Sequence, residues 1–248
     1  MRPPCHPAAP VANGQRKVDL GEDEVEDAVE NLTLIRHVVI DRHRLDPEVL
    51  GERPNRQGCR SPGVGDVSDD SALVDDGGGD YPVTKRDTDA ALAEVGGLTL
   101  VLVRPPAILG PGATSVWNTL RPARARDGER RVEKSTSWGW LHVDDLAALL
   151  ADVATGAVAT ADDPDVGPVQ GGTTAVLVAG EHATWREYMG TVCEALGVEP
   201  EWTDDPGWTG RLVPERARRW GWSPTVDLTT ALAELRAGLL GSTRRADA

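Results

Sequence analysis

Residues 80–95, DYPVTKRDTDAALAEV, place a tyrosine four residues before a lysine in a segment with the character of a helix. Residues four apart lie on one face of a helix, so Tyr81 and Lys85 are expected to project together. A neighbouring ammonium group favours the phenolate and lowers the pKa of a phenol, which is ordinarily about 10. Such a pair can take a proton from a hydroxyl group while hydride leaves the same carbon, or return it in reverse. The structural alternative is that Tyr81 packs at a helix start and Lys85 is solvated.

The elements expected around this helix are those of an α/β protein. Pro82 suits a first helical turn, and Gly96-Gly97 marks the end of the helix. The apolar run LTLVLVRP (98–105) is typical of a strand buried on both faces of a parallel sheet, and TAVLVAG (174–180) is typical of a second one. Strands that alternate with helices of this length predict a parallel sheet built from right-handed βαβ units.

Further helices are expected before and after the second strand in the sequence. HVDDLAALLADVATG (142–156) predicts a helix capped by Asp144 or Asp145. TWREYMGTVCEALG (184–197) opens with a capping box formed by Thr184 and Glu187, and Gly197 closes it. A short helix is expected in PERARRW (214–220), a turn in GWSP (221–224), and a last helix over about 228–240.

The N-terminal third carries weaker signals. Residues 1–16 are rich in Pro and Ala and are expected to be disordered. A short strand, an acidic helix from about residue 22 and an apolar strand over 32–40 follow. Residues 46–80 are rich in Gly, Pro, Asp and Ser and show no period of 2 or 3.6, so no element is assigned there.

The composition favours a globular protein and argues against a nucleic-acid binder. The chain has 248 residues, 40% of them hydrophobic, with eight Trp and no Phe, which suits one domain with a small appendage. A net charge of -14 argues against nucleic acid as a partner, because phosphate contacts need clustered cations. The Arg-rich segments RPARARDGERR (121–131) and PERARRW are interpreted as solvated surface, with phosphate binding as the alternative.

The cysteines and the apolar segments suggest a cytoplasmic protein. Cys5, Cys59 and Cys193 are far apart and have no His at ligand spacing, so neither a metal site nor a disulfide framework is expected. The N-terminus lacks an apolar signal core, and no run of eighteen apolar residues occurs. We therefore expect neither secretion nor a membrane partner.

Several motifs taken together resemble the extended short-chain dehydrogenase/reductase family, the group of NAD-dependent epimerases/dehydratases and 3-beta-hydroxysteroid dehydrogenase-like enzymes. The motifs, in chain order, are YPVTK (81–85), LVLVRPPAILGPG (100–112), LHVDDLAALL (141–150), TAVLVAGEHATWREYMGTVCEALG (174–197) and WGWSPTVDL (220–228). Their order and combination are more specific than the Tyr and Lys alone. The resemblance implies a Rossmann-like parallel sheet with a small C-terminal α/β lobe that binds substrate.

The resemblance also implies roles for individual residues. Tyr81 looks like the catalytic acid/base, and Lys85 like the residue that lowers its pKa and binds the nicotinamide ribose. Arg104 and Pro105 fall where the family's chain meets the cofactor, at the carboxyl end of a strand, which is also where a site is expected in a parallel sheet. The alternative is that this segment only terminates the strand.

Other positions allow two interpretations. Trp117 and Asn118 lie in the family's substrate region, where they would stack on substrate or bond it, or else belong to core or surface. His142 and Asp144 occupy family-like positions. We interpret His142 as structural and Asp144 as a helix cap.

The cofactor half of the resemblance is incomplete. The sequence contains no G-x-x-G-x-x-G turn, whose backbone would hold the pyrophosphate. Asp19 resembles the acidic residue that faces the adenine, and Ser61 the serine that holds the substrate oxygen. Ser68 and Ser71 are alternatives to Ser61, and any of the three serines would otherwise be a loop residue. The expected division is a truncated Rossmann-like domain over 17–160 and a substrate-binding region over 161–248 that interleaves with the sheet.

Two functions of different classes fit these observations. The first is an enzyme that uses NAD or NADP to oxidise, reduce or epimerise a hydroxyl or carbonyl group of a small molecule, such as a nucleotide sugar or a sterol-like alcohol. The second is a catalytically silent relative that binds or regulates. A hydrolase is not favoured, because no G-x-S-x-G elbow occurs. A homodimer is implied by resemblance alone.

Overall fold

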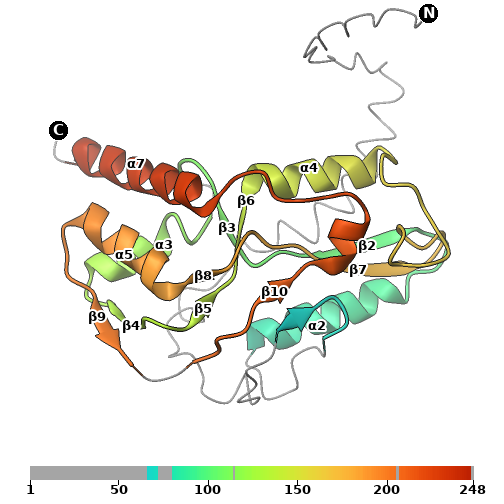
Figure 1. Cartoon of the computed structure of the whole chain (residues 1–248), viewed down its shortest axis with the longest axis horizontal. Coiled ribbons are helices and arrows are strands. Elements are labelled where there is room, and N and C mark those ends of the chain that lie inside the picture. The colour runs from blue at the N-terminus through green and yellow to red at the C-terminus, as the bar shows by residue number, and fades with distance from the viewer. Residues whose placement is uncertain (1–65, 72–79, 114, 205–206, 247–248) are drawn as a thin grey trace, which may run out of the picture.

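The computed structural model describes residues 66–71, 80–113, 115–204 and 207–246 (Figure 1). The elements predicted between residues 17 and 40 lie outside the described residues, as do Asp19 and Ser61. The described elements, in chain order, are β1 (Val67–Ser68), α2 (Asp80–Ala93), β2 (Leu100–Arg104), β3 (Ala107–Leu109), α3 (Leu120–Arg126), β4 (Arg131–Glu133), β5 (Ser137–Trp138), β6 (Trp140–His142), α4 (Val143–Ala154), β7 (Thr173–Leu177), β8 (Ala183–Thr184), α5 (Trp185–Leu196), β9 (Glu201–Thr203), β10 (Leu212–Val213), α6 (Glu215–Arg219) and α7 (Leu228–Ala246).

The described strands form pairs, most of which are parallel. β2 pairs with β7 in register from Leu100 opposite Thr173 to Arg104 opposite Leu177. β1 with β10, β3 with β6 and β4 with β9 are also parallel, whereas β5 and β8 are antiparallel. In Figure 1, α4 lies above the β2–β7 pair and α2 below it. These parallel pairs, with helices between them in sequence, confirm the predicted α/β class.

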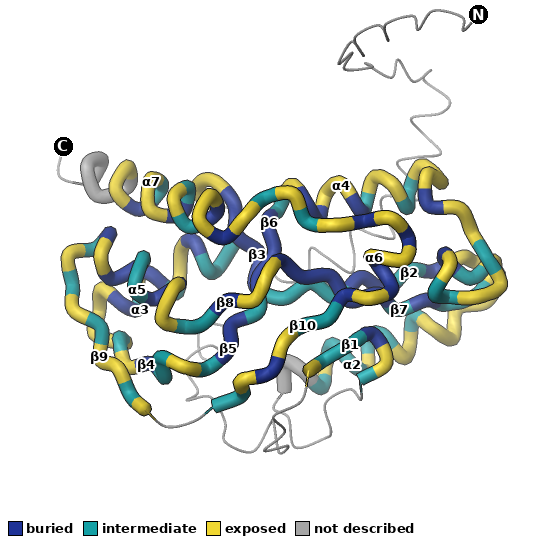
Figure 2. The backbone as a smooth tube through the Cα atoms, viewed as in Figure 1, coloured by how far each residue is buried: buried dark blue, intermediate teal, exposed yellow. Residues whose placement is uncertain are grey.

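Two clusters of buried side chains form the core. One consists of residues from β2, β3, β6 and β7 with α4 and α6, and it includes Trp220 and Trp222. The other joins β3 and β6 to α5 and α7, and its aromatic members include Trp138, Trp140 and Tyr188. Figure 2 shows this buried backbone running through the centre of the molecule, while much of α2 is exposed or half-buried. Tryptophan therefore supplies most of the large aromatic packing, as expected of a chain without Phe.

Helix α5 has the ends that its sequence predicts. The Glu187 carboxylate accepts hydrogen bonds from the N–H and the hydroxyl of Thr184, at 2.6 and 2.9 Å. Gly197 adopts a φ of 67°, the left-handed conformation that ends a helix without a Cβ penalty. The predicted short helix, the α6 segment, and the predicted last helix, α7, are also present.

The predicted cap of α4 is wrong. His142, rather than Asp144 or Asp145, is the N-cap: its Nδ1 accepts a hydrogen bond from the Asp144 N–H at 3.2 Å. The cause is that β6 runs directly into α4, so the last strand residue, with extended backbone, occupies the capping position. Asp145 is instead 3% exposed, and its carboxylate accepts hydrogen bonds from Thr225 and from the Val226 N–H.

The interpretation of PERARRW as solvated surface is wrong for Arg216. This side chain is buried, and its guanidinium donates to Asp70, Asp165 and the Ala175 carbonyl oxygen. The carboxylates offset the cost of removing the cation from water, which is why burial is tolerated here. The interaction also joins α6 to the segment 66–71, part of the stretch for which the sequence predicts no element.

Candidate active site

The two residues with the expected chemistry lie on α2, as predicted. Tyr81 belongs to the first turn of the helix, and Lys85 follows one turn later. The Lys85 side chain is half-buried. The side chain of Tyr81 lies outside the described residues, so its approach to the Lys85 ammonium stays a prediction.

Arg104 ends β2 and joins it to α2. Its Nε and Nη2 donate to Oδ2 of Asp89 at 3.1 and 2.9 Å, and both side chains are partly buried. Asp89 lies two turns after Tyr81 on the same face of α2. The ion pair therefore joins α2 to the carboxyl end of β2. Asp89 is a residue that the sequence analysis did not single out.

The carboxyl ends of β2 and β7 lie next to each other, because Arg104 and Leu177 are opposite in the parallel register. Pro105 and Pro106 follow Arg104 at this edge. The carboxyl edge of a parallel sheet is the usual place of a ligand site. The structure thus brings Arg104 and Pro105 to the edge that the sequence predicts, while contact of either residue with a cofactor stays a prediction.

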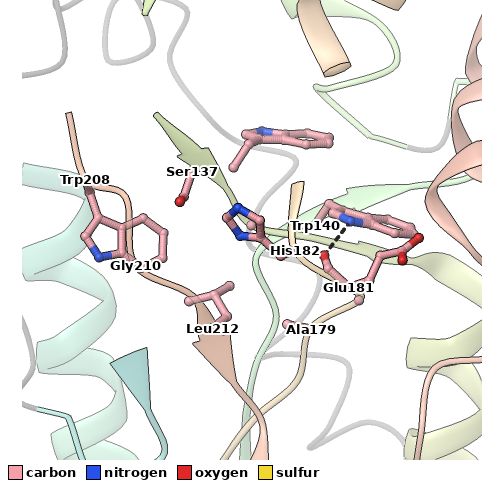
Figure 3. Close-up of a pocket in the computed structure, with 11 residues that line it drawn as sticks. Ser137, Trp140, Ala179, Glu181, His182, Trp208, Gly210 and Leu212 are labelled. Atoms are coloured by element: carbon pink, nitrogen blue, oxygen red, sulfur yellow. Dashed lines mark hydrogen bonds between the residues drawn. The ribbon is translucent and has the colours of Figure 1, made fainter. Parts of the chain in front are cut away.

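A small cavity opens near this edge (Figure 3). Ser137, Trp140, His182, Trp208 and Leu212 are among the residues that line it, and the Trp140 indole N–H donates to the Glu181 carbonyl oxygen at 2.9 Å. Its volume is about 20 Å³, which is room for a single water molecule rather than a substrate.

A second cleft is much larger and contains one of the predicted substrate residues. It has a volume of about 420 Å³, within the range of small-molecule sites, and lies between the segment 112–119 and α7. Asn118 lines it, and the Asn118 amide donates to the Gly110 carbonyl oxygen at 2.6 Å. The amide is therefore held in one orientation beside the cleft, and its contact with substrate stays a prediction.

Trp117 lies in an aromatic cluster with Trp138, Trp185 and Tyr188. Its ring centroid is 5.7–5.8 Å from those of the three other rings. The Trp117 carbonyl oxygen accepts a hydrogen bond from the Tyr188 hydroxyl at 2.6 Å. These contacts are those of the core alternative, and stacking of Trp117 on a substrate stays a prediction.

Tyr188 has an environment unsuited to proton transfer. It is fully buried, and burial raises the pKa of its phenol far above the ordinary value. Its hydroxyl already donates to the Trp117 carbonyl. The chain contains two tyrosines, so Tyr81 is the remaining candidate for a phenolic acid/base.

The contacts of His142 fit a structural role. Its ring is 1% exposed, and Nε2 lies 2.9 Å from Oε2 of Glu234 on α7. Since Nδ1 accepts the Asp144 N–H, the proton of a neutral ring is on Nε2 and is donated to Glu234. His142 therefore ties α4 to α7. Asp144 itself is largely exposed.

Ser68 and Ser71 lie near the carboxyl end of β7. The Asp69 carboxylate between them accepts hydrogen bonds from the Leu177 N–H and the Arg216 N–H, at 2.7 and 3.0 Å. The Ser71 hydroxyl accepts a bond from the Ser68 N–H at 2.8 Å. Asp69 and Arg216 were missed by sequence reasoning, since their partners are remote in the chain. The burial of a single arginine such as Arg216 produces no periodic pattern in the sequence from which it could be predicted.

The described residues offer neither a metal site nor a membrane-spanning helix. They contain no cluster of three or more His, Cys, Asp or Glu side chains arranged to hold a metal ion. Within the same residues, every helix is too short or too polar to cross a membrane.

Comparison with known proteins gives matches among solved structures. No protein-family model matches the sequence. No curated protein matches it either. The similar structures include the PbgP3 protein from Burkholderia pseudomallei, which is 18% identical over 67% of this chain and 54% of that chain, with a TM-score of 0.49. The enzyme WbmG from Bordetella bronchiseptica in complex with NAD is 19% identical over 74% and 56%, with a TM-score of 0.46.

A UDP-glucose 4-epimerase from Thermus thermophilus in complex with NAD is 20% identical over 65% of this chain and 54% of that chain, with a TM-score of 0.45. The matches thus include the epimerase type of enzyme that the sequence motifs also resemble. The chain spans about half the length of these structures. Similarity at this level assigns neither an activity nor a substrate to the chain.

Proposed function

We propose that the chain is an NAD(P)-dependent enzyme of the oxidoreductase/epimerase type, which acts on a hydroxyl or carbonyl group of a small molecule through Tyr81 and Lys85. The observation that carries the proposal is the helical spacing of these two residues on α2, joined by the Asp89–Arg104 ion pair to the carboxyl end of β2. The burial of Tyr188 supports it by leaving Tyr81 as the phenol suited to proton transfer.

In this proposal, the chain's own residues move and hold the proton. The Lys85 ammonium stabilises the phenolate of Tyr81, which takes the proton from the substrate hydroxyl as the carbonyl forms. A serine hydroxyl, from Ser61, Ser68 or Ser71, holds the substrate oxygen. Asn118 binds substrate from the cleft that it lines.

NAD or NADP, when bound, would accept or return the hydride. At the nicotinamide end, Lys85 would bond the ribose and Pro105 would border the ring. The Arg104 guanidinium is already bonded to Asp89. At this position the cofactor would therefore contact Pro105 and the backbone instead of the guanidinium. Asp19 would face the adenine. The described residues thus suit the nicotinamide end of the cofactor.

The ionisation of Tyr81 tests the proposal without knowledge of the substrate. A protein with two tyrosines labelled at Cζ gives two carbon resonances, and Tyr81→Phe identifies one of them. We expect the pKa of Tyr81 to lie about 1–3 units below 10 in the native protein and to return toward 10 in Lys85→Met. A value near 10 that Lys85→Met leaves unchanged would overturn the proposal.

Cofactor binding and turnover provide the second measurement. We expect NADH or NADPH to show enhanced nicotinamide fluorescence with the protein, and Tyr81→Phe to abolish turnover of any substrate found. The alternative function, a catalytically silent binding or regulatory relative, is favoured by one observation: the 248 residues contain no G-x-x-G-x-x-G turn. Failure of both cofactors to bind at about millimolar concentration, far above usual enzyme affinities, would support that alternative.

A further inference from the structure

We propose that the cleft between the segment 112–119 and α7 binds an uncharged, largely apolar organic molecule rather than a nucleotide or another phosphorylated ligand. The binding itself requires neither Tyr81 nor a cofactor. The further statement that this ligand is the substrate rests on the proposed function. It assigns the substrate to uncharged alcohols or ketones with an apolar body, and not to nucleotide sugars.

The first observation is the composition of the cleft walls. The described residues that line the cleft are all Gly, Ala or Leu, except for Asn118 and Thr119, and none of them carries an ionisable side chain. A bound diphosphate needs cations or several hydrogen-bond donors in place of its water. Walls of this composition suit an uncharged ligand, whose binding is driven by burial of apolar surface.

The second observation is that the two polar side chains of the walls already have partners. The Asn118 amide donates to the Gly110 carbonyl oxygen at 2.6 Å, and the Ser115 hydroxyl lies 3.1 Å from its Oδ1. The Thr119 hydroxyl donates to the Ser115 carbonyl oxygen at 2.9 Å. An amide has two N–H donors, so within the described contacts Asn118 keeps one of them. One donor suffices for a hydroxyl or carbonyl oxygen, but not for a diphosphate.

The charged side chains on the adjoining part of α7 are bonded to other elements. Leu235 lines the cleft, and its neighbours in the chain are Glu234 and Arg236. Oε2 of Glu234 lies 2.9 Å from Nε2 of His142, the last residue of β6. Nη2 of Arg236 donates to Glu194 of α5 at 2.8 Å. Neither charge of this part of α7 therefore serves as a counter-ion for a ligand in the cleft.

Large apolar side chains are also exposed at positions next to the lining residues. Leu120 follows Thr119 and is 37% exposed, and Leu240 follows Leu239 and is 42% exposed. They come from the two segments that form the walls, α3 with the chain before it and α7. Apolar side chains that remain exposed beside a cleft are a feature of ligand-binding surfaces.

Gly238 allows the cleft to be filled by substitution. It lines the cleft, and a methyl group at this position would lie 3.8 Å from N and 3.9 Å from Cα of Gly112 in the other wall. These distances are ordinary van der Waals contacts, so Gly238→Ala should leave the cleft open, whereas the longer side chain of Gly238→Leu should fill it. Both substitutions favour the helix, because Gly has a lower helix propensity than Ala or Leu.

The test uses two fluorescent probes that differ in charge, N-phenyl-1-naphthylamine and 8-anilino-1-naphthalenesulfonate. We expect the uncharged amine to bind with enhanced fluorescence and the sulfonate to bind about tenfold more weakly or less, since its charge finds no partner. Gly238→Leu should weaken binding of the amine about tenfold, and Gly238→Ala should leave it unchanged. Decahydro-2-naphthol, an uncharged fused-ring alcohol, should displace the amine, and UDP-glucose should not.

Ala237→Lys is a second variant, at an exposed position of the wall, in case the leucine variant does not fold. Its ammonium should strengthen binding of the sulfonate probe, because it adds the missing counter-ion.

The inference is overturned if the amine fails to bind, if Gly238→Leu leaves its binding unchanged, or if UDP-glucose displaces it. An unchanged affinity of Ala237→Lys for the sulfonate also overturns it. If the probes behave as expected but the pKa of Tyr81 is near 10 and unaffected by Lys85→Met, the proposed function fails and the cleft keeps its ligand class. If the Tyr81 titration succeeds and the amine does not bind, the inference alone fails.

Discussion

The buried phenol of Tyr188 offers a quantitative test of the structure. Tyr188 is fully buried against Trp138, with ring centroids 4.3 Å apart, and donates its hydroxyl hydrogen to the Trp117 carbonyl at 2.6 Å. Tyr188→Phe keeps the ring but removes the hydroxyl. At pH 7 we expect the free energy of unfolding to fall by about 1–2 kcal/mol, because the hydrogen bond is lost and the carbonyl of Trp117 is left without that donor.

The effect of this substitution should reverse at alkaline pH. Burial raises the pKa of Tyr188 in the native protein, whereas the unfolded phenol ionises at about pH 10. Above about pH 10 the unfolded state therefore binds fewer protons than the native state. The wild-type protein then loses about 1.4 kcal/mol of stability per pH unit through this group, and the Phe variant does not. The two stabilities should become equal at about pH 11, one unit above the ionisation of the unfolded phenol.

Urea unfolding followed by tryptophan fluorescence at pH 7, 9, 10 and 11 measures both effects, as long as the transition is two-state. Burial also raises the pKa of Cys193, but this contribution is present in both proteins and cancels in their difference. Thr191→Val is a matched control, because it removes an exposed hydroxyl bond on α5 from a group that does not titrate. A difference between wild type and Tyr188→Phe that stays constant from pH 7 to 11 would refute the burial of this phenol.

Two further predictions concern the ends of helices. Asp145→Ala should lower the free energy of unfolding by about 3 kcal/mol in urea denaturation, since the Thr225 hydroxyl and the N–H groups of Thr225 and Val226 lose their acceptor. Asp145→Asn should cost less. Equal losses in the two variants would contradict the role of the Asp145 carboxylate as this acceptor. Glu187→Ala should lower stability by about 0.5–1 kcal/mol in thermal unfolding, because the Thr184 N–H loses its carboxylate partner. An unchanged melting temperature would contradict the capping box.

The features that sequence predicted well depend on neighbours in the chain. The start and end of α5 follow from Thr184, Glu187 and Gly197, all within fourteen positions. The strands β2 and β7 follow from two apolar runs of the length and composition of buried parallel strands, whereas their pairing with each other is seen in the structure alone. In both cases the local sequence and the final packing favour the same structure, so one can be inferred from the other.

The features that sequence missed depend on residues far apart. Arg216 belongs to a segment rich in charge, and it is buried because Asp165 and Asp70 lie 51 and 146 positions away. The cap of α4 was assigned to an aspartate on propensity, yet the direct passage of β6 into α4 places His142 there. Propensity gives way when tertiary structure sets the point at which a helix begins.

The contacts of Arg216 also indicate which candidate serine lies near the carboxyl ends of β2 and β7. Its backbone N–H and that of Leu177, the last residue of β7, both donate to Asp69. Ser68 precedes this anchored carboxylate and therefore lies beside the same sheet edge as Arg104, the residue opposite Leu177 in the register. A buried cation is stable only while its carboxylate partners stay in place, so the network holds the segment 66–71 to the sheet as firmly as it holds Arg216. Arg216 of α6 thus makes the contacts that fix the position of Ser68, a candidate substrate-binding serine. This arginine belongs to a charged segment that the sequence alone indicates as solvated surface.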